Sequence, residues 1–143
     1  ALRGLRRAAA HLRRGHVVAL FPEGRLSLNG SPGPAHRGVG ALVRRVRVPV
    51  IPAAVRGGFR AWPRGARWLR LSDVRVRFGS PLRWEDVPAA VEAREPKEAE
   101  RAFARAVMER IQALWAAMPR RPGDAPAPPE SEGAERLVLD RTL

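Results

Sequence analysis

The segment from Val17 to Asn29, VVALFPEGRLSLN, decides the fold of this chain, because an apolar run gives way abruptly to charged and polar residues. The run His16–Phe21 reads as a short strand that is apolar on both faces, which is typical of an interior strand in a parallel sheet. Ligands of open α/β sheets bind just beyond the carboxyl ends of the strands. We therefore expect a binding site at Glu23, Gly24 and Arg25.

The sequence around this segment predicts an α/β domain. Leucine and alanine recur at helical spacing over residues 2–12, and Gly15 is placed to stop that helix. A second helix is predicted over 39–46. A second buried strand is predicted over 48–55, where two prolines favour a strand start, an edge or a bulge. Strand, loop, helix and strand in this order are typical of a right-handed parallel crossover, so the predicted fold is a mostly parallel sheet flanked by helices.

The remaining sequence predicts a loop, an edge strand, a helix and a tail. Residues 56–71 read as a long loop rich in glycine, arginine and aromatic residues, and alternation over 74–78 predicts a half-exposed edge strand. Pro96 suits the first turn of a helix that runs to Met118 and packs on the sheet. The expected organisation is an α/β domain over 1–95, its packing helix over 96–118 and a disordered tail over 119–143, which has little apolar surface.

Composition limits the classes of function. The chain carries 27 Lys and Arg against 14 Asp and Glu, a net charge of +13, and Lys97 is its only lysine. Such a basic surface either attracts nucleic acid or anionic lipid, the latter by roughly 1 kcal/mol for each basic side chain near the membrane, or is a solvated surface with no particular partner. The absence of cysteine excludes disulfides and thiolate chemistry, and three scattered histidines give no reason to expect a metal site.

Two further features concern the setting of the chain. No apolar run approaches the roughly 20 residues that span a bilayer, so we expect any membrane contact to be at the surface. The sequence begins at Ala1 and enters a helical pattern at once, without a capping turn. We therefore expect a fragment whose domain is incomplete at the N-terminus.

Three pieces of the chain resemble, in order, blocks of the glycerophospholipid acyltransferases, the 1-acylglycerol-3-phosphate acyltransferase family. FPEGRLS, Phe21–Ser27, resembles the third block. HRGVGALVRRVRVPVIPAAV, His36–Val55, is similar to the helix that follows and to the fourth block, and AWPRGARWLRLSDVRVRFGSPL, Ala61–Leu82, is similar to the closing strand. The resemblance covers residues 2–82 and implies the C-terminal half of the family's catalytic domain.

The resemblance implies acyl transfer from acyl-CoA or acyl-carrier protein to a hydroxyl of lysophosphatidic acid or a related lysophospholipid, with no separate cofactor. The family's general base is a histidine in an HxxxxD block, whose aspartate orients the imidazole. His11, His16 and His36 all lack an aspartate five residues later. No catalytic residue is therefore assigned in this chain, and the fragment alone is expected to be inactive.

The resemblance places substrate-binding residues in the FPEG segment. Arg25 offers a planar fork of donors that matches phosphate oxygens. Gly24 lets the backbone approach the ligand, Ser27 donates its hydroxyl or caps the turn, and Glu23 accepts hydrogen bonds from a substrate hydroxyl, a backbone amide or Arg25. The commonest family form has Thr at the position of Arg25 and Arg at that of Leu26, so the cation here is displaced by one residue.

Further residues have two readings each. Arg37 precedes a helix and either contacts a phosphate or belongs to a solvated helix start. Val50, Ile51 and Pro52 either wall an acyl pocket or belong to the core. Three aromatic residues of the long loop either insert at a lipid interface or pack internally: Phe59, Trp62 and Trp68.

The favoured interpretation is a peripheral acyltransferase at the cytoplasmic face of an anionic membrane, without a nucleic-acid partner. One alternative is a basic nucleic-acid-binding protein in which Trp62 or Trp68 stacks on bases, although the sequence holds no recognised nucleic-acid motif. Another alternative is a lipid-binding remnant without catalytic activity.

Overall fold

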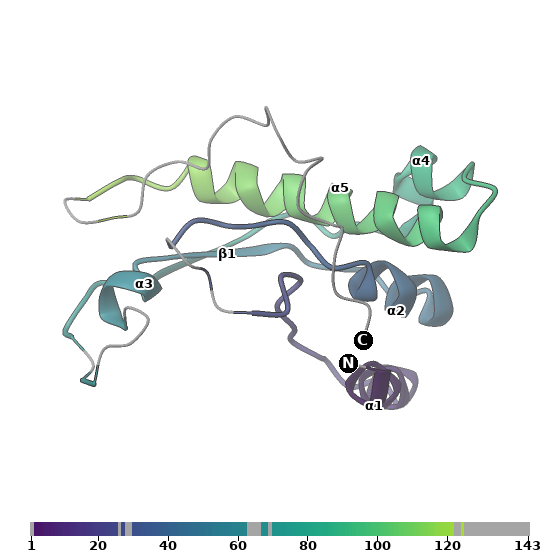
Figure 1. Ribbon diagram of the computed structural model, residues 1–143, viewed down its shortest axis with the longest axis horizontal. Helices are drawn as coiled ribbons and strands as arrows, with labels where there is room; N and C mark the ends of the chain where they lie inside the picture. Colours follow the sequence, from purple (N-terminus) through teal and green to yellow (C-terminus); the bar gives the residue numbers. More distant parts are fainter. Residues whose placement is uncertain are drawn as a thin grey trace, which may run out of the picture.

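The computed structural model describes residues 2–25, 27, 30–62, 67–68, 70–121 and 124. The long helix α5 runs along the two-stranded sheet, and α2 lies between α5 and α1 (Figure 1). The elements of this part of the chain are α1 (Leu2–Arg13), α2 (Gly38–Val46), β1 (Ala53–Arg56), α3 (Gly58–Ala61), β2 (Arg75–Phe78), η1 (Trp84–Asp86), α4 (Pro88–Val91) and α5 (Pro96–Ala116).

The sheet of the described residues is an antiparallel pair, β1 with β2, with Ala53 opposite Phe78 and Arg56 opposite Arg75. An isolated antiparallel bridge between Val50 and Leu82 extends the pairing. The strand predicted over 48–55 thus becomes regular only at Ala53, because the prolines before it have no N–H to donate to a ladder.

The strand predicted over His16–Phe21 is not formed, and this prediction needs correction. Those residues pair with no strand, and the side chains of Val17 and Phe21 are 96% and 80% exposed. An interior strand needs a hydrogen-bonded neighbour, and in the described part of the chain β1 is paired with β2 instead. The mostly parallel sheet therefore finds no support here, whereas a helix on the sheet is confirmed.

The core lies between α5, α2, α4 and the sheet. The helix predicted from Pro96 is confirmed, and Phe103, Val107 and Trp115 on its buried face are each at most 1% exposed. Trp84 of η1 stacks on Phe103 with ring centroids 5.1 Å apart. Aromatic pairs at this separation add to the stabilisation from burial alone.

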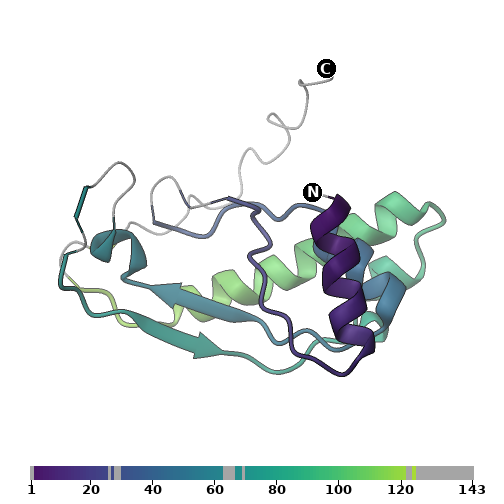
Figure 2. The same cartoon turned by 90° about the horizontal axis from the view of Figure 1, so that it is seen from below.

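Close contact between α2 and α5 explains why α2 contains glycine. A β-carbon on Gly40 would collide with the backbone oxygen of Glu100, so only glycine fits at this crossing. The carboxylate of Glu100 is 7% exposed and accepts hydrogen bonds from Arg37 at 2.6 Å and Arg44 at 3.1 Å. Helix α1 packs on α2 on the side away from α5 (Figure 2).

The first residues of the predicted tail contact the sheet. The backbone oxygen of Pro119 accepts a hydrogen bond from Arg75, and Arg121 pairs with Asp73. Residues 122–123 and 125–143, which make up most of that predicted tail, lie outside the described residues.

Candidate functional site

The loop after Phe21 is closed by two hydrogen bonds that join its ends. The backbone N–H of His36 donates to the oxygen of Pro22 at 2.9 Å, and that of Gly33 donates to Oε2 of Glu23 at 2.9 Å. The Glu23 carboxylate therefore accepts from a backbone amide, one of the three roles that the sequence offered. This hydrogen bond joins Glu23 to the far side of the loop at Gly33.

Gly24 forms the sharp bend of this loop. Its N–H donates to the oxygen of Phe21 at 3.0 Å, and its φ of 64° lies in the left-handed region that favours glycine. A β-carbon at this position would lie 2.8 Å from Cδ2 of His36. The imidazole of His36 thus lies against the bend, a contact that the sequence did not predict.

Ser27 closes a smaller turn within the same loop. Its hydroxyl donates to the oxygen of Ser31 at 2.7 Å and accepts from the N–H of Gly30 at 2.8 Å. Of the two predicted roles, capping a turn is the one seen here. Leu26 lies outside the described residues.

Arg25 is exposed, and it makes no hydrogen bond or ion pair within the part of the chain that the structure describes. Its neighbours Glu23 and Ser27 are both engaged in holding the loop. The arrangement therefore presents one exposed guanidinium on a loop whose backbone is tied at several points. Such a group is suited to an anionic oxygen ligand.

Arg37 and the predicted acyl-pocket residues have different surroundings. Arg37 pairs with Glu100 while its side chain stays 48% exposed, so its contact with a phosphate remains a prediction. Pro52 is fully buried, Val50 is partly buried against the core, and Ile51 is 59% exposed. Pro52 also lines a shallow depression of about 270 Å³ beside Gly79 and Leu114. The role of these residues in an acyl pocket stays a prediction.

Two histidines that the sequence analysis treated as unconnected, His11 and His16, lie side by side in the structure. His11 and His16 lie with their Nδ1 atoms 3.1 Å apart at the exposed end of α1. Among the described residues, no group of three His, Cys, Asp or Glu is arranged to hold a metal ion. The same part of the chain contains no helix with the length and apolar character needed to cross a membrane.

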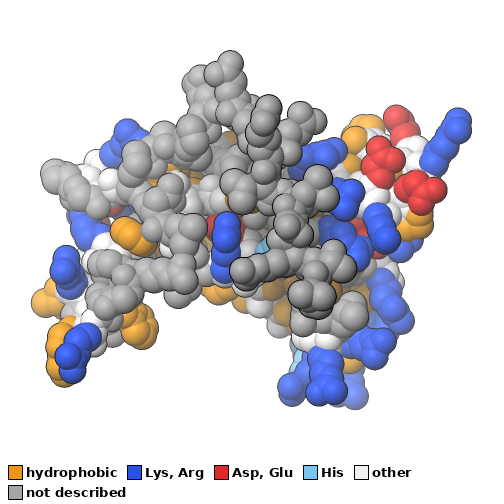
Figure 3. All heavy atoms as spheres, viewed as in Figure 1, with side chains coloured by type: hydrophobic (Ala, Val, Ile, Leu, Met, Phe, Trp, Pro, Cys, Tyr) orange, Lys and Arg blue, Asp and Glu red, His pale blue; other side chains and the backbone are white. Residues whose placement is uncertain are grey.

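The aromatic loop is largely exposed. Trp62 and Trp68 are 62% and 81% exposed, whereas Phe59 is half-buried. Hydrophobic side chains gather at the left end of the molecule in Figure 3, where α3 lies. Lysine and arginine side chains gather at the lower right, around α1. The side chains that suit the predicted membrane contact therefore lie at two ends of the molecule, apolar ones near α3 and basic ones around α1.

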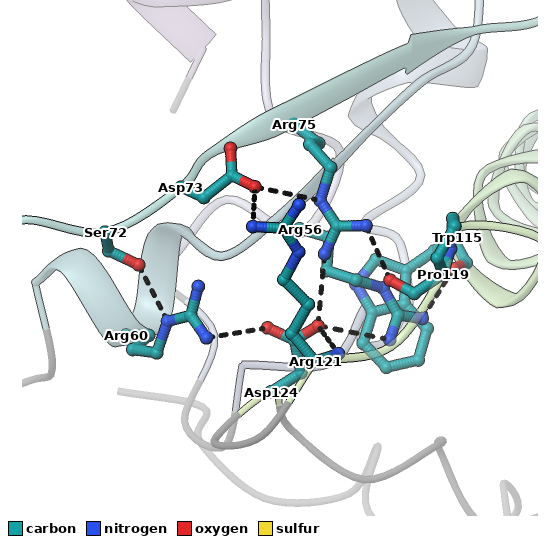
Figure 4. A network of polar contacts seen from close by, with 9 residues as sticks. All are labelled: Arg56, Arg60, Ser72, Asp73, Arg75, Trp115, Pro119, Arg121 and Asp124. Carbon is teal, nitrogen blue, oxygen red and sulfur yellow. Dashed lines mark hydrogen bonds and ion pairs between the residues drawn. The ribbon is translucent and has the colours of Figure 1, made fainter.

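Sequence reasoning missed a cluster of arginines beside the sheet. Arg56, Arg60 and Arg75, from β1, α3 and β2, surround the carboxylate of Asp124 (Figure 4). The spacing of Arg56 and Arg60 around a glycine pair was the available signal. The contacts with Arg75 and Asp124 could not be predicted from the sequence, because they follow from the pairing of β1 with β2 and the path of the chain after α5.

Comparisons with known proteins agree with this architecture. The family model described as Acyltransferase matches residues 2–56, from α1 to the end of β1. The chain is 33% identical over 79 residues to the chloroplastic 1-acyl-sn-glycerol-3-phosphate acyltransferase BAT2 of Brassica napus. This match covers 54% of this chain and 23% of that protein. It is 27% identical over 79 residues to a 1-acyl-sn-glycerol-3-phosphate acyltransferase of Cocos nucifera, covering 55% of this chain and 26% of that protein.

The fold is similar to that of a solved acyltransferase structure. The crystal structure of the 1-acyl-sn-glycerophosphate (LPA) acyltransferase PlsC from Thermotoga maritima matches with a TM-score of 0.67 and 21% identity, over 85% of this chain and 48% of that one. The chain thus spans about a quarter of the length of the two curated relatives and about half of the solved chain. Over residues 2–56 this chain is thus similar to the acyltransferase family, and over 79 residues to two 1-acyl-sn-glycerol-3-phosphate acyltransferases, and its fold resembles that of PlsC.

Proposed function

We propose that this chain supplies the acceptor-binding part of a glycerophospholipid acyltransferase. The observation that carries the proposal is the exposed guanidinium of Arg25 on a loop closed by Glu23 and Ser27. The acceptor is lysophosphatidic acid or a related lysophospholipid, and the acyl donor is acyl-CoA or acyl-carrier protein. No further cofactor takes part.

The chemistry assigns a binding role to these residues. Arg25 holds the acceptor phosphate through charge-assisted hydrogen bonds, which fixes the position of the acceptor hydroxyl. That hydroxyl attacks the thioester carbonyl, an ester bond forms, and the thiol leaves with the proton that the base removed. The base is a histidine of an HxxxxD block, which the 143 residues do not contain, so we expect no turnover from this chain alone.

We also propose that the protein works at the surface of an anionic membrane. The exposed Trp62 and Trp68 suit the interfacial region, where aromatic side chains are enriched. The exposed arginines of α1 add attraction to anionic lipid headgroups: Arg3, Arg6, Arg7 and Arg13.

The test is binding of a water-soluble, short-chain lysophosphatidic acid, measured by titration calorimetry. Arg25→Gln is expected to weaken binding about 10-fold or more, since a charged hydrogen bond contributes about 1.5–3 kcal/mol. Arg94→Gln removes the same charge from another exposed position and serves as the matched control. Equal weakening in both variants would show a general charge effect and contradict the proposal.

The expected inactivity has its own test. Acyl transfer from acyl-CoA to lysophosphatidic acid is measured with the chain alone. Robust turnover that survives replacement of His11, His16 and His36 by alanine would refute our account of the base.

A further inference from the structure

Three guanidiniums from separate elements converge on one carboxylate (Figure 4). Asp124 Oδ2 lies 3.9 Å from Nη1 of Arg56 and 3.3 Å from Nη2 of Arg75, and its Oδ1 lies 3.9 Å from Nη1 of Arg60. The side chains of Arg56 and Asp124 are each 2% exposed. The sheet pairing and α3 therefore build a buried basic site, with Asp124 inside it.

The polar groups of this site are incompletely satisfied. Nη2 of Arg56 donates to the backbone oxygen of Trp115 at 2.6 Å, but Nε and Nη1 of Arg56 are buried without a hydrogen-bond partner among the described residues. Oδ1 of Asp124 and Nε of Arg75 are also buried without one. Burial lowers the pKa of Arg56, an effect that the Asp124 charge opposes. Unpaired buried donors on a charged group are costly and point to a missing acceptor.

Asp124 fits the site poorly in both geometry and charge. Two of its three guanidinium contacts are 3.9 Å long and are not hydrogen bonds, whereas Oδ2 accepts from Nη2 of Arg75 at 3.3 Å and from the backbone N–H of Arg121 at 2.9 Å. A carboxylate also has only two oxygens to share among three guanidiniums. Within the described part of the chain, this polar network contains two carboxylates, Asp73 and Asp124, against four guanidiniums: Arg56, Arg60, Arg75 and Arg121.

We propose that Arg56, Arg60 and Arg75 form a binding site for a phosphate group, which replaces the carboxylate of Asp124. A phosphate monoester carries up to two negative charges and three terminal oxygens, one for each guanidinium. Arginine matches such oxygens with its planar fork of donors. Asp124 comes from the segment after α5, whereas Arg56, Arg60 and Arg75 are held on β1, α3 and β2, so Asp124 is the group that yields.

Asp124→Asn removes the competing charge and keeps the shape of the side chain. Inorganic phosphate is titrated at constant ionic strength and followed by tryptophan fluorescence, because Arg56 lies over the ring of Trp115. The variant is expected to bind phosphate at least 10-fold more tightly than the unchanged chain. Glu92→Gln, which removes an exposed carboxylate at the end of α4, is expected to leave the affinity unchanged. Equal affinity in Asp124→Asn and the unchanged chain would overturn the proposal.

A second comparison does not depend on folding of Asp124→Asn. Phosphate is expected to raise the Tm of the unchanged chain more than that of Arg75→Gln. Arg101→Gln, on the exposed face of α5, is the matched control and should respond like the unchanged chain. An equal rise in Arg75→Gln and Arg101→Gln would count against a specific site.

The source of the phosphate is decided by two soluble probes. Adenosine 3′,5′-bisphosphate represents the nucleotide part of a thioester donor, and glycerol 3-phosphate represents a glycerolipid acceptor. The probe that binds more tightly identifies the source of the phosphate. Failure of both probes to displace inorganic phosphate overturns the proposal. These measurements are independent of Arg25, so they can succeed or fail separately from the proposed function.

Discussion

The guanidinium of Arg56 lies over the indole ring of Trp115, with its central carbon 3.7 Å from the ring centroid, while the same side chain donates to the backbone oxygen of Trp115. This contact fastens β1 to the end of α5. A desolvated cation over an indole contributes up to about 2 kcal/mol, in addition to the burial of the ring.

Replacing Trp115 by alanine is therefore expected to lower the free energy of unfolding by about 3–5 kcal/mol, the range for large aromatic residues in a core. Urea denaturation followed by circular dichroism measures the change. Trp68→Ala removes the same side chain from a site that is 81% exposed and should cost less than about 0.5 kcal/mol. Similar losses in the two variants would contradict the role of the Arg56 contact.

Gly40→Ala is expected to disrupt the crossing of α2 and α5, because the new methyl group meets the backbone oxygen of Glu100. Overpacking of this kind costs about 1–3 kcal/mol or more. Gly4→Ala in α1 has nothing within 4 Å and should stabilise the chain, since alanine is favoured over glycine in helices by about 1 kcal/mol. Thermal melting of the two variants should thus shift in opposite directions.

Glu100→Gln tests the ion pairs at the same crossing. The carboxylate is nearly buried but its partners Arg37 and Arg44 are 48% and 42% exposed, so we expect a loss of about 1–2 kcal/mol. Glu109→Gln, on the exposed side of α5, should be within about 0.5 kcal/mol of the unchanged chain. The loss at Glu100 should shrink in high salt; a loss of the same size in 1 M salt, where the Debye length is about 3 Å, would argue against an ionic origin.

Gly24→Ala separates backbone strain from the contact with His36. Gly15 and Gly24 both have positive φ, so alanine at either position should cost about 1 kcal/mol of stability. Only at Gly24 does the added carbon meet another side chain, the imidazole of His36. We expect Gly24→Ala, but not Gly15→Ala, to weaken binding of lysophosphatidic acid. Equal weakening in the two variants would show that the loss of binding is not specific to the loop at Gly24.

Trp68→Ser tests the proposed membrane contact. It is expected to weaken binding to vesicles that contain anionic phospholipid, measured by co-sedimentation at physiological salt, since an exposed indole would leave the interface. Val91→Ser, an exposed apolar residue of α4, is the control and should bind like the unchanged chain. Equal binding of duplex DNA and vesicles by the unchanged chain would leave the nucleic-acid alternative open, whereas selective binding of vesicles would exclude it.

The sequence predicted the parts of the fold that depend on neighbouring residues. The periodicity over 2–12 and the proline at 96 located α1 and α5, because helical hydrogen bonds connect residues four apart. The alternation over 74–78 likewise located β2. The prediction over 16–21 was wrong because a short apolar run does not reveal whether a partner strand lies beside it.

The candidate site was predicted in part for the same reason. Gly24 and Ser27 form the turns that their residue types favour, and these contacts lie within ten residues along the chain. The Arg56 cluster was not predicted, because Asp124 and Trp115 are about 60 residues away in sequence and meet Arg56 only through tertiary packing.

The crossing of α2 and α5 has a consequence for biosynthesis. The face of α2 that carries Val39 and Val43 is buried in the core with α5, whose contact residue, Glu100, follows about 60 residues later. At translation rates of about 5–20 residues per second, that face waits roughly 3–12 seconds for its partner. During this interval the nascent chain exposes an apolar helix face that chaperones recognise, so slow translation of this stretch should increase aggregation.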